Sequence, residues 1–137
     1  MSYHQSIPSA VMNAYQGVEP EHRVTLLALR DMIFEVAQSD PRIGEVEETL
    51  RWGEPAYITA RKKTGSTIRL GIEKASGLPA LFFICNTSLV EDFRNQFGAL
   101  LRYSKNRAVL IDDNESQHKS ALAMCIASAL TYHLPKH

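Results

Sequence analysis

The apolar residues near the start of the chain recur at the three- and four-residue spacing of an amphipathic helix. The repeat is carried by one stripe of side chains: Leu26, Leu29, Ile33 and Val36. Charged residues stay outside that stripe, so the pattern predicts a long helix that packs one face on a core. Pro20 is placed to open this helix, because proline is tolerated in a first helical turn. A shorter helix is predicted over residues 8–16, closed by Gly17.

The stretch that follows the long helix contains a cap signal and a stop signal. Asp40 followed by Pro41 is typical of a helix N-cap and first turn, which predicts a third, short helix running to Arg51. Gly53 then supplies the backbone freedom that ends a helix, and Pro55 forbids its continuation. The chain is therefore expected to turn a corner here, from helix into strand.

After this corner, apolar and polar residues alternate with the period of two that is typical of strands. Two such runs follow each other, and we expect them to form a hairpin. A two-residue loop would set Arg61 opposite Ile68 and split the apolar faces, whereas a three-residue loop over residues 63–65 sets Ala60 opposite Ile68. The alternation therefore predicts the three-residue loop.

This register carries three further predictions. Tyr57 is expected opposite Gly71, where its ring would cover the glycine backbone. Thr59 is expected opposite Arg69. Gly65, in the loop, is expected in a left-handed conformation.

Three more strands are predicted further along the chain. Residues 80–85 are apolar on both faces, as expected of a strand that is central or covered twice. Residues 100–103 and 107–111 flank a turn at Lys105-Asn106 and are expected to pair. The register of this second hairpin stays open, because both of its faces are partly apolar.

Two more helices complete the pattern. Ser88 with Glu91 forms a capping-box pattern for a helix that ends at Gly98. Asn114 can cap the last helix, which ends before Pro135. The order is two helices, a short helix, three strands, a helix, two strands and a helix. It predicts an α+β fold, with a largely antiparallel five-stranded sheet packed by helices.

Length and charge limit the class of protein. Residues 1–137 are expected to form a single domain with its own core. Fifteen basic and fifteen acidic side chains cancel, so no global field attracts nucleic acid or an anionic membrane, and neither partner is expected. No apolar run approaches the length that spans a bilayer.

The cysteines and the N-terminus favour a reducing compartment. Residues 1–10 have neither a basic region nor a long apolar run, so no export signal is expected. Cys85 and Cys125 lie far apart in apolar surroundings, without a CxxC spacing. We expect two buried, reduced thiols in a cytoplasmic protein, with a catalytic thiol or a disulfide as the alternatives.

Several short motifs are spread over about residues 20–132: Arg51-Trp52-Gly53-Glu54-Pro55-Ala56-Tyr57, Gly65-Ser66-Thr67-Ile68-Arg69-Leu70, Phe83-Ile84-Cys85-Asn86-Thr87, Phe93-Arg94 with Phe97-Gly98, and Tyr103 with Asn106-Arg107. Together they resemble the YdhG-like family (domain of unknown function 1801). The resemblance implies an intracellular α+β domain. Because some members of that family are described as frataxin-like iron chaperones, it also implies a possible role in iron binding.

Three carboxylates of the predicted short helix could hold a hard cation: Glu45, Glu47 and Glu48. Glu45 and Glu48 lie three residues apart, on neighbouring positions of a helix surface. The alternative is a solvated helix face, on which Glu47 pairs with Arg51. The five histidines form no HExxH motif, so a zinc site is not expected.

Catalytic motifs give no stronger hypothesis. The chain has no GxSxG motif and no glycine-rich phosphate loop. Cys85, beside Asn86 and Thr87, ends an apolar strand, which favours packing over nucleophilic catalysis. Asp112 and Asp113 could be an acid and base pair, but adjacent residues in a strand point to opposite sides. The sequence assigns no cofactor.

The remaining candidate site is aromatic and cationic. Its residues come from the helix-to-strand corner and the two hairpins: Arg51, Trp52, Tyr57, Thr59, Arg69, Tyr103 and Arg107. Guanidinium groups and ring faces of this kind could bind an anion or a planar ligand. In the alternative interpretation they hold the fold, with Trp52 filling the corner and Arg69 tying down a helix end.

These candidates lead to one functional expectation and two alternatives. We expect a noncatalytic intracellular binding module for a small anionic or planar ligand or a protein partner, acting as a monomer or homodimer. A frataxin-like iron-binding chaperone is the first alternative. An enzyme of unknown reaction is the second.

Overall fold

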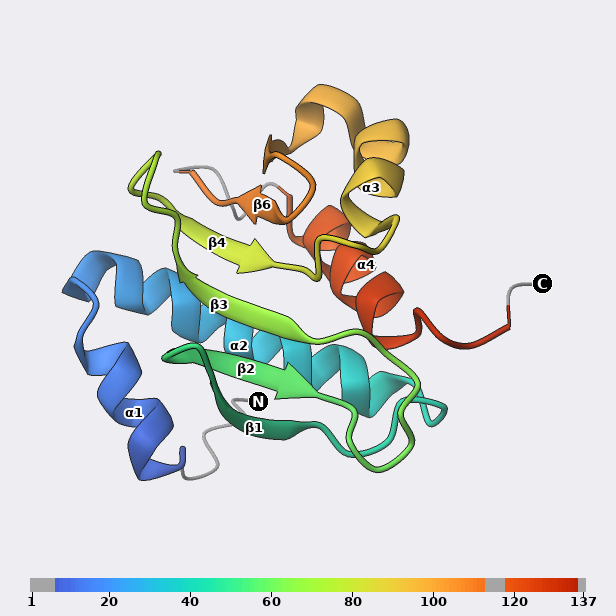
Figure 1. Ribbon diagram of the computed structural model, residues 1–137, viewed down its shortest axis with the longest axis horizontal. Helices are drawn as coiled ribbons and strands as arrows, with labels where there is room; N and C mark the ends of the chain where they lie inside the picture. Colours follow the sequence, from blue (N-terminus) through green and yellow to red (C-terminus); the bar gives the residue numbers. More distant parts are fainter. Residues whose placement is uncertain (1–6, 113–117, 136–137) are drawn as a thin grey trace.

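The protein folds into two layers, a sheet and the helices that pack on it (Figure 1). The computed structural model describes residues 7–112 and 118–135. The elements in chain order are α1 (Ser9–Gln16), α2 (Pro20–Ser39), β1 (Glu47–Arg51), β2 (Glu54–Ile58), β3 (Ile68–Ile72), β4 (Pro79–Phe82), α3 (Leu89–Phe97), the 3-10 turn η1 (Gly98–Leu100), β5 (Arg102–Ser104), β6 (Ala108–Leu110) and α4 (Lys119–Leu130).

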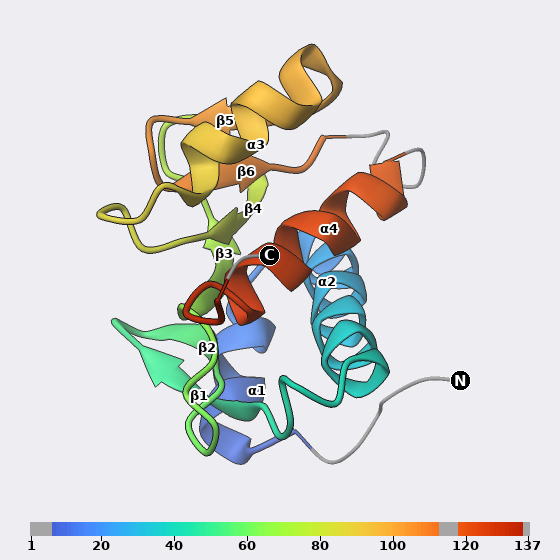
Figure 2. The same cartoon turned by 90° about the vertical axis from the view of Figure 1, so that its right-hand side faces the viewer.

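The sheet has six strands in the order β1-β2-β3-β4-β6-β5, and every neighbouring pair is antiparallel. Seen edge-on, α2 and α4 lie on one side of it (Figure 2). The main core fills the space between sheet and helices, where Ile33 of α2, Leu81 of β4 and Cys125 of α4 are fully buried. Within the described ranges, no helix has both the length and the apolar content to cross a membrane.

The strongest local signals are confirmed. α1 ends at Gln16 and α2 begins at Pro20, at the predicted boundaries. The predicted central strand is β4, which lies between β3 and β6 and is buried on both faces. α3 ends where predicted, at Gly98 with a φ of 52°. Each feature follows from an apolar pattern or a proline or glycine within a few residues, so it needs no information from distant parts of the chain.

The predicted third helix is wrong, and β1 replaces it, so the sheet has six strands instead of five. The cap signal makes only a turn: Asp40 Oδ1 accepts a hydrogen bond from the Arg42 backbone N–H at 3.0 Å, and Ile43 N–H donates to Asp40 O at 3.0 Å. Gly44, with a φ of 73°, then turns the chain out of helical geometry. The backbone of the following residues, β1, forms hydrogen bonds with β2. This pairing stabilises the segment as a strand, whereas a helix this short is only marginally stable.

β1 and β2 form a hairpin with a two-residue turn, Trp52-Gly53. Arg51 pairs with Glu54 across it, and the φ angles of Trp52 and Gly53 are 52° and 78°. Two positive φ angles suit the right-handed twist of the strands, which is why tight hairpins prefer such turns. The expected helix-to-strand corner is therefore a strand-to-strand turn.

The predicted register of the next hairpin is also wrong. β2 and β3 pair Tyr57 with Ile68 and Ala56 with Arg69, so Tyr57 does not face Gly71 and Ala60 does not face Ile68. The connection is correspondingly longer than three residues. Its middle docks on the end of α4, where Ser66 N–H donates to Ala129 O at 2.8 Å.

Gly65 does not have the predicted left-handed conformation. Its requirement is space, because a Cβ at this position would lie 2.5 Å from Leu130 Cα. Next to it, Thr64 Oγ1 donates to Leu130 O at 2.9 Å and His133 N–H donates to Thr64 O at 2.8 Å. These contacts join segments far apart in the sequence, so strand alternation alone could not reveal them.

In the second half, β5 and β6 confirm the second hairpin and settle its register, with Tyr103 opposite Val109. The capping box at Ser88 is wrong: its hydroxyl makes no cap hydrogen bond and donates instead to Asp92 Oδ2 at 2.9 Å. The predicted cap Asn114, like Asp113, lies outside the described residues.

The two thiols have opposite environments. Cys125 is fully buried, as predicted, and burial raises the pKa of its thiol to about 12. Cys85 is exposed, which corrects the prediction of a second buried thiol. Because β4 ends at Phe82, Cys85 lies in the connection to α3 and not in the buried strand that its apolar neighbours suggested.

Candidate ligand-binding face of the sheet

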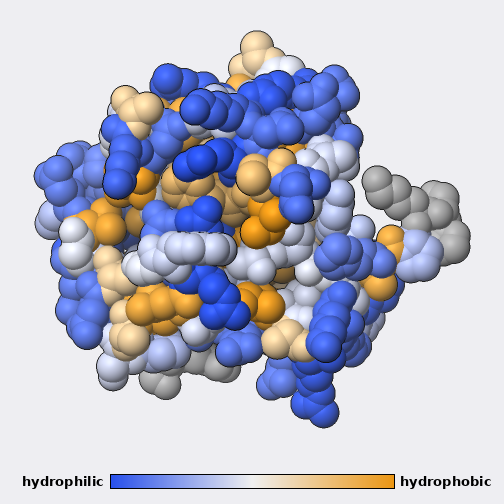
Figure 3. Space-filling view, viewed as in Figure 1, coloured by the Kyte–Doolittle hydropathy of each residue, from blue (hydrophilic) through white to orange (hydrophobic). Residues whose placement is uncertain are grey.

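The face of the sheet opposite the main helical core, here called the outer face, carries the candidate site. One row of paired residues crosses it from β1 to β5: Thr49, Ala56, Arg69, Phe82, Ala108 and Ser104. Four apolar residues of β4 and β6 form a small cluster there, separate from the main core: Ala80, Phe82, Ala108 and Leu110. Figure 3 looks onto this face and shows apolar surface enclosed by hydrophilic side chains.

Trp52 stands at the β1–β2 turn with 80 % of its surface exposed. The Arg69 Cζ atom lies 5.3 Å from the centre of its ring and 5.2 Å from the centre of the Phe82 ring. Arg69 thus contacts two aromatic rings, a geometry in which the ring faces attract the guanidinium. The interpretation in which Trp52 fills a corner of the fold is wrong, because the ring is in solvent.

The Arg69 guanidinium is held by a carboxylate as well as by rings. Arg69 Nη1 donates to Glu54 Oε1, and both side chains are partly buried. The Glu54 side chain lies over Gly71, where an added Cβ would come within 2.9 Å of Glu54 Cδ. The glycine backbone is therefore covered by Glu54 and not by Tyr57. These contacts hold the Arg69 side chain in place.

A hollow of about 370 Å³ lies beside this pair on the outer face. Its apolar part includes Phe82 and Ile72. Six charged side chains line it, four basic and two acidic: Arg69, Lys74, Lys105, Arg107, Glu54 and Glu73. The hollow is therefore positively charged overall, which favours anions.

The acidic side chains of the hollow are already engaged. Glu54 pairs with Arg69. Hydrogen bonds from the Ser104 and Ser76 hydroxyls lower the pKa of Glu73, and the charge of Arg107 contributes in the same direction. Both carboxylates thus have partners of the protein's own, while Lys74 and Lys105 extend exposed ammonium groups at the rim.

Of the seven residues that the sequence singled out, four gather on or beside the outer face. Trp52 and Arg69 are in contact, and Arg107 lines the hollow. Arg51 is exposed next to Trp52, at the end of β1.

The other three serve the fold. Tyr57 is fully buried on the helix side, and its hydroxyl donates to Glu48 Oε2 at 2.8 Å. Thr59 is buried, and its Oγ1 accepts a hydrogen bond from Gly65 N–H at 2.9 Å. Tyr103 packs on the main core and donates to Phe93 O at 3.1 Å. The prediction that Tyr57 and Thr59 lie beside Arg69 depended on the predicted hairpin register, and it is wrong for the same reason.

The sequence interpretation missed Phe82, Lys74 and Lys105. The signal for Phe82 was present, because a strand that is apolar on both faces must send some of its rings outward. Lys74 and Lys105 lie in turns, and their approach to Phe82 depends on how β3, β4 and β5 come together.

The three glutamates of the alternative metal site, Glu45, Glu47 and Glu48, lie in different environments. Glu48 faces the core and binds Arg30, with Arg30 Nη2 donating to Glu48 Oε1 at 2.9 Å. Glu47 is exposed, and Glu45 lies 3.5 Å from Arg61 Nη1 in an exposed ion pair. Since the segment is extended and not helical, Glu45 and Glu48 do not share a surface. Across residues 7–112 and 118–135, no three His, Cys, Asp or Glu side chains are arranged to hold a metal ion.

Arg30 and Glu48 belong to a buried polar network with Tyr15 and Tyr57. The Tyr15 hydroxyl hydrogen-bonds to the Tyr57 hydroxyl, which donates to Glu48. Burial, the largest cause, raises the pKa of both tyrosines above its ordinary value, so both stay neutral. The network connects α1, α2, β1 and β2 inside the core, where it has no access to the outer face.

No family model, curated protein or solved structure matches the chain. The outer face is therefore interpreted from its own geometry.

Proposed function

We propose that the protein is a noncatalytic binding module whose outer face holds a small, planar, anionic ligand. The observation that carries this proposal is the Trp52 ring, which is 80 % exposed, adopts a positive φ and lies against Arg69 beside a basic hollow. A large aromatic ring in a strained backbone conformation costs stability, and such strain persists mainly where it serves binding or catalysis.

The charges of the hollow support an anion. Lys105 and Arg107 are exposed and line the hollow together with Arg69, which lies over the buried Phe82 ring. A ring of the ligand would stack on the exposed Trp52 ring, and its anionic group would lie near the basic side chains. Arg69 would position the ring and not pair with the anion, because Glu54 already occupies its guanidinium.

The alternatives have less support. The iron-chaperone proposal rests on the resemblance to the YdhG-like family, and Glu45, Glu47 and Glu48 do not converge. An enzyme would need a reactive group aimed at the hollow, and the groups that line it are an engaged ion pair, lysines, an arginine and one hydroxyl already bound to Glu73. A protein partner would cover the same face, and the test below separates it from a small ligand.

The test uses naphthalene-2-sulfonate as the planar anion and naphthalene-2-sulfonamide as its neutral counterpart. Trp52 is the only tryptophan, so its indole N–H gives a single resolved NMR signal at the site. We expect the sulfonate to shift that signal in a saturable way and to bind about tenfold more tightly than the sulfonamide. Equal binding of the two compounds, or a signal that does not move, would contradict a planar-anion site.

A matched pair of variants tests the basic rim. Replacing both Lys105 and Arg107 by glutamine removes two charges from the hollow and is expected to weaken sulfonate binding about tenfold. Lys119→Gln removes an exposed charge at the start of α4 and is the control, with unchanged binding expected. The small-ligand proposal is wrong if neither naphthalene compound binds, while a protein partner binds the wild type and does not bind variants of Trp52 or Arg107. In that case the face is a protein-docking surface.

A further inference from the structure

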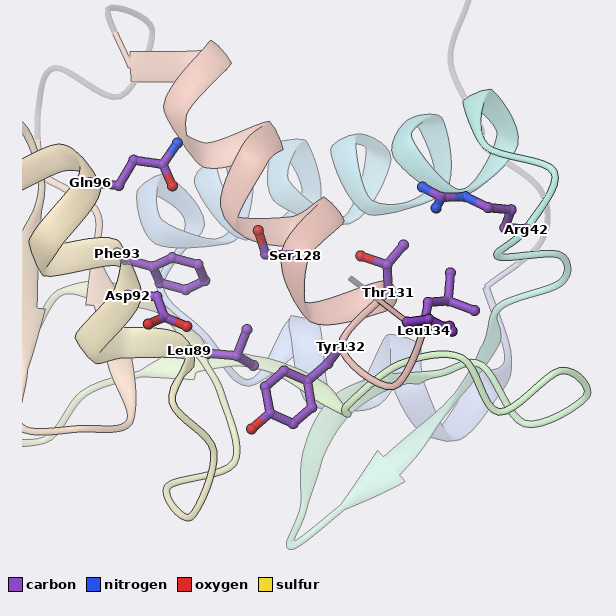
Figure 4. Close-up of a pocket in the computed structure, with 10 residues that line it drawn as sticks. Arg42, Leu89, Asp92, Phe93, Gln96, Ser128, Thr131, Tyr132 and Leu134 are labelled. Carbon is purple, nitrogen blue, oxygen red and sulfur yellow. The ribbon is translucent and has the colours of Figure 1, made fainter. Parts of the chain in front are cut away.

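A second pocket lies between α3 and the end of α4 (Figure 4). Its volume is about 170 Å³, close to that of a cavity of roughly 150 Å³ that holds a benzene ring. None of the residues that line it belongs to the hollow on the outer face. The two sites are therefore separate.

The apolar wall of this pocket comes mainly from α3. Leu89 and Phe93 are 2 % and 1 % exposed, and both point from α3 toward α4 in Figure 4. Tyr132, just after α4, adds an aromatic ring, and its hydroxyl accepts a hydrogen bond from Ser88 N–H at 3.3 Å. Leu89 and Phe93 therefore close the floor of the pocket, and the tethered, half-buried Tyr132 ring offers preformed apolar surface to a small group.

The polar part of the pocket favours positive charge. Asp92 lies at its α3 side, exposed, and accepts a hydrogen bond from Ser88 Oγ at 2.9 Å. Arg42 lies at the opposite side of the last turn of α4 in Figure 4. Its charge is balanced by Asp40, to which Arg42 Nη2 donates at 2.7 Å and Nε at 3.0 Å.

The ion pair with Arg42 also lowers the pKa of Asp40, so both groups stay charged at neutral pH. In the described part of the chain, Asp92 has no ion pair of this kind. The C-terminal end of α4, which carries the partial negative charge of the helix dipole, faces the same pocket through Ser128. The unbalanced charge of the pocket is therefore negative.

We propose that the pocket binds a small organic cation, a protonated primary amine that carries an apolar group. The apolar group lies against the half-buried Tyr132 ring, above the floor formed by Leu89 and Phe93. The ammonium group donates to the Asp92 carboxylate and lies near the face of the Tyr132 ring. The proposal is independent of the ligand of the outer face, because the two sites share no residue.

The test compares benzylamine with benzyl alcohol, a neutral molecule of the same size. Binding is followed on the full-length protein by NMR, through the backbone amide signals of Leu89, Asp92 and Ser128. We expect benzylamine to shift them in a saturable way and to bind about tenfold more tightly than benzyl alcohol. Equal affinities would show an apolar pocket without cation preference, and no saturable shift up to the solubility limit would show no site. Either result overturns the proposal.

Two variants of neighbouring residues in α3 test whether the negative charge that binds the ammonium group is that of Asp92. Asp92→Asn keeps an oxygen that can accept the Ser88 hydrogen bond but removes the negative charge, and it is expected to weaken benzylamine binding about tenfold. Glu91→Gln removes an exposed charge that does not line the pocket and is expected to leave binding unchanged. If both variants weaken binding equally, or if neither does, Asp92 is not the cation ligand. Thermal melting of each variant confirms that the fold is intact.

Discussion

At the residue scale, Trp52 combines two features that the fold itself does not require. Its φ of 52° lies in the left-handed region, which tight hairpin turns fill with asparagine or glycine, and its ring is 80 % exposed. The contact with Arg69 at 5.3 Å recovers part of that cost, since an exposed cation–π pair contributes about 0.5–1 kcal/mol. Under the proposed function, the exposed ring is available to a ligand.

This residue allows stability and binding to be separated. Trp52→Asn gives the turn the sequence Asn-Gly, which suits two positive φ angles. We expect its free energy of unfolding, measured by urea denaturation, to fall by no more than about 0.5 kcal/mol, because relief of strain offsets the lost ring contact.

The same variant is expected to lose most of the naphthalene-2-sulfonate binding. The result that would contradict this view is a variant destabilised by 2 kcal/mol or more, on the order of a lost core contact. In that case Trp52 holds the hairpin together and its exposure has no bearing on a ligand.

At the scale of elements, the connection between β2 and β3 is fixed by its contact with α4 and not by its own turn chemistry. Gly65 lies directly on the backbone of Leu130, and hydrogen bonds on both sides of it hold the two segments together. This docking limits where β3 can begin to pair with β2. It is one reason why the β2–β3 register differs from that of a hairpin with a three-residue loop.

Gly65→Ala tests that contact. The added methyl group would lie 2.5 Å from Leu130 Cα and O, and because these are backbone atoms they cannot move aside without displacing the helix end. We expect the free energy of unfolding to fall by about 3 kcal/mol.

Gly17→Ala is the matched control. There the nearest atom, Ala14 O, would be at an ordinary 3.5 Å and the backbone is in the right-handed helical region, so stability is expected to rise by about 0.5 kcal/mol. Equal effects of the two substitutions in chemical denaturation would show that the loop is not docked as described.

At the scale of the whole molecule, the buried network of Tyr15, Arg30, Glu48 and Tyr57 ties the N-terminal helices to the β1 edge of the sheet. Arg30 and Glu48 have side chains only 2 % and 7 % exposed. A buried ion pair of this kind adds little net stability compared with apolar residues, but removing one partner is costly because the other charge stays buried. We expect the network to make the packing of these elements specific.

Glu48→Gln keeps an oxygen that can accept the hydrogen bond of the Tyr57 hydroxyl, but it removes the nearest counter-charge of Arg30. We expect a loss of about 3–5 kcal/mol in the free energy of unfolding. Adding Arg30→Met to that variant removes the buried charge and is expected to recover part of the loss.

Glu47→Gln, a neighbour with an exposed side chain, provides the control and is expected to change stability by less than about 0.5 kcal/mol. A double variant less stable than Glu48→Gln alone would mean that the packing of the Arg30 side chain, and not the loss of Glu48 as its counter-charge, dominates at this position.

Several elements could be predicted from local signals in the sequence. The apolar stripe and Pro20 give α2, the run of apolar residues gives the central strand β4, and Gly98 ends α3. Part of the candidate site could also be predicted, because Trp52 and Arg69 stand out as a ring and a cation near a break in the pattern. These features depend on residues a few positions apart, which interact in the same way in any fold.

The remaining features depend on contacts between segments far apart in the sequence. β1 is a strand because β2 supplies its hydrogen-bond partners, and the β2–β3 register follows the docking of Gly65 on α4. The exposure of Trp52 and the approach of Lys105 to Phe82 depend on the pairing of strands distant in sequence. A short segment marginal as a helix takes whichever structure satisfies its backbone and buries its apolar side, and that choice is made by segments far away along the chain.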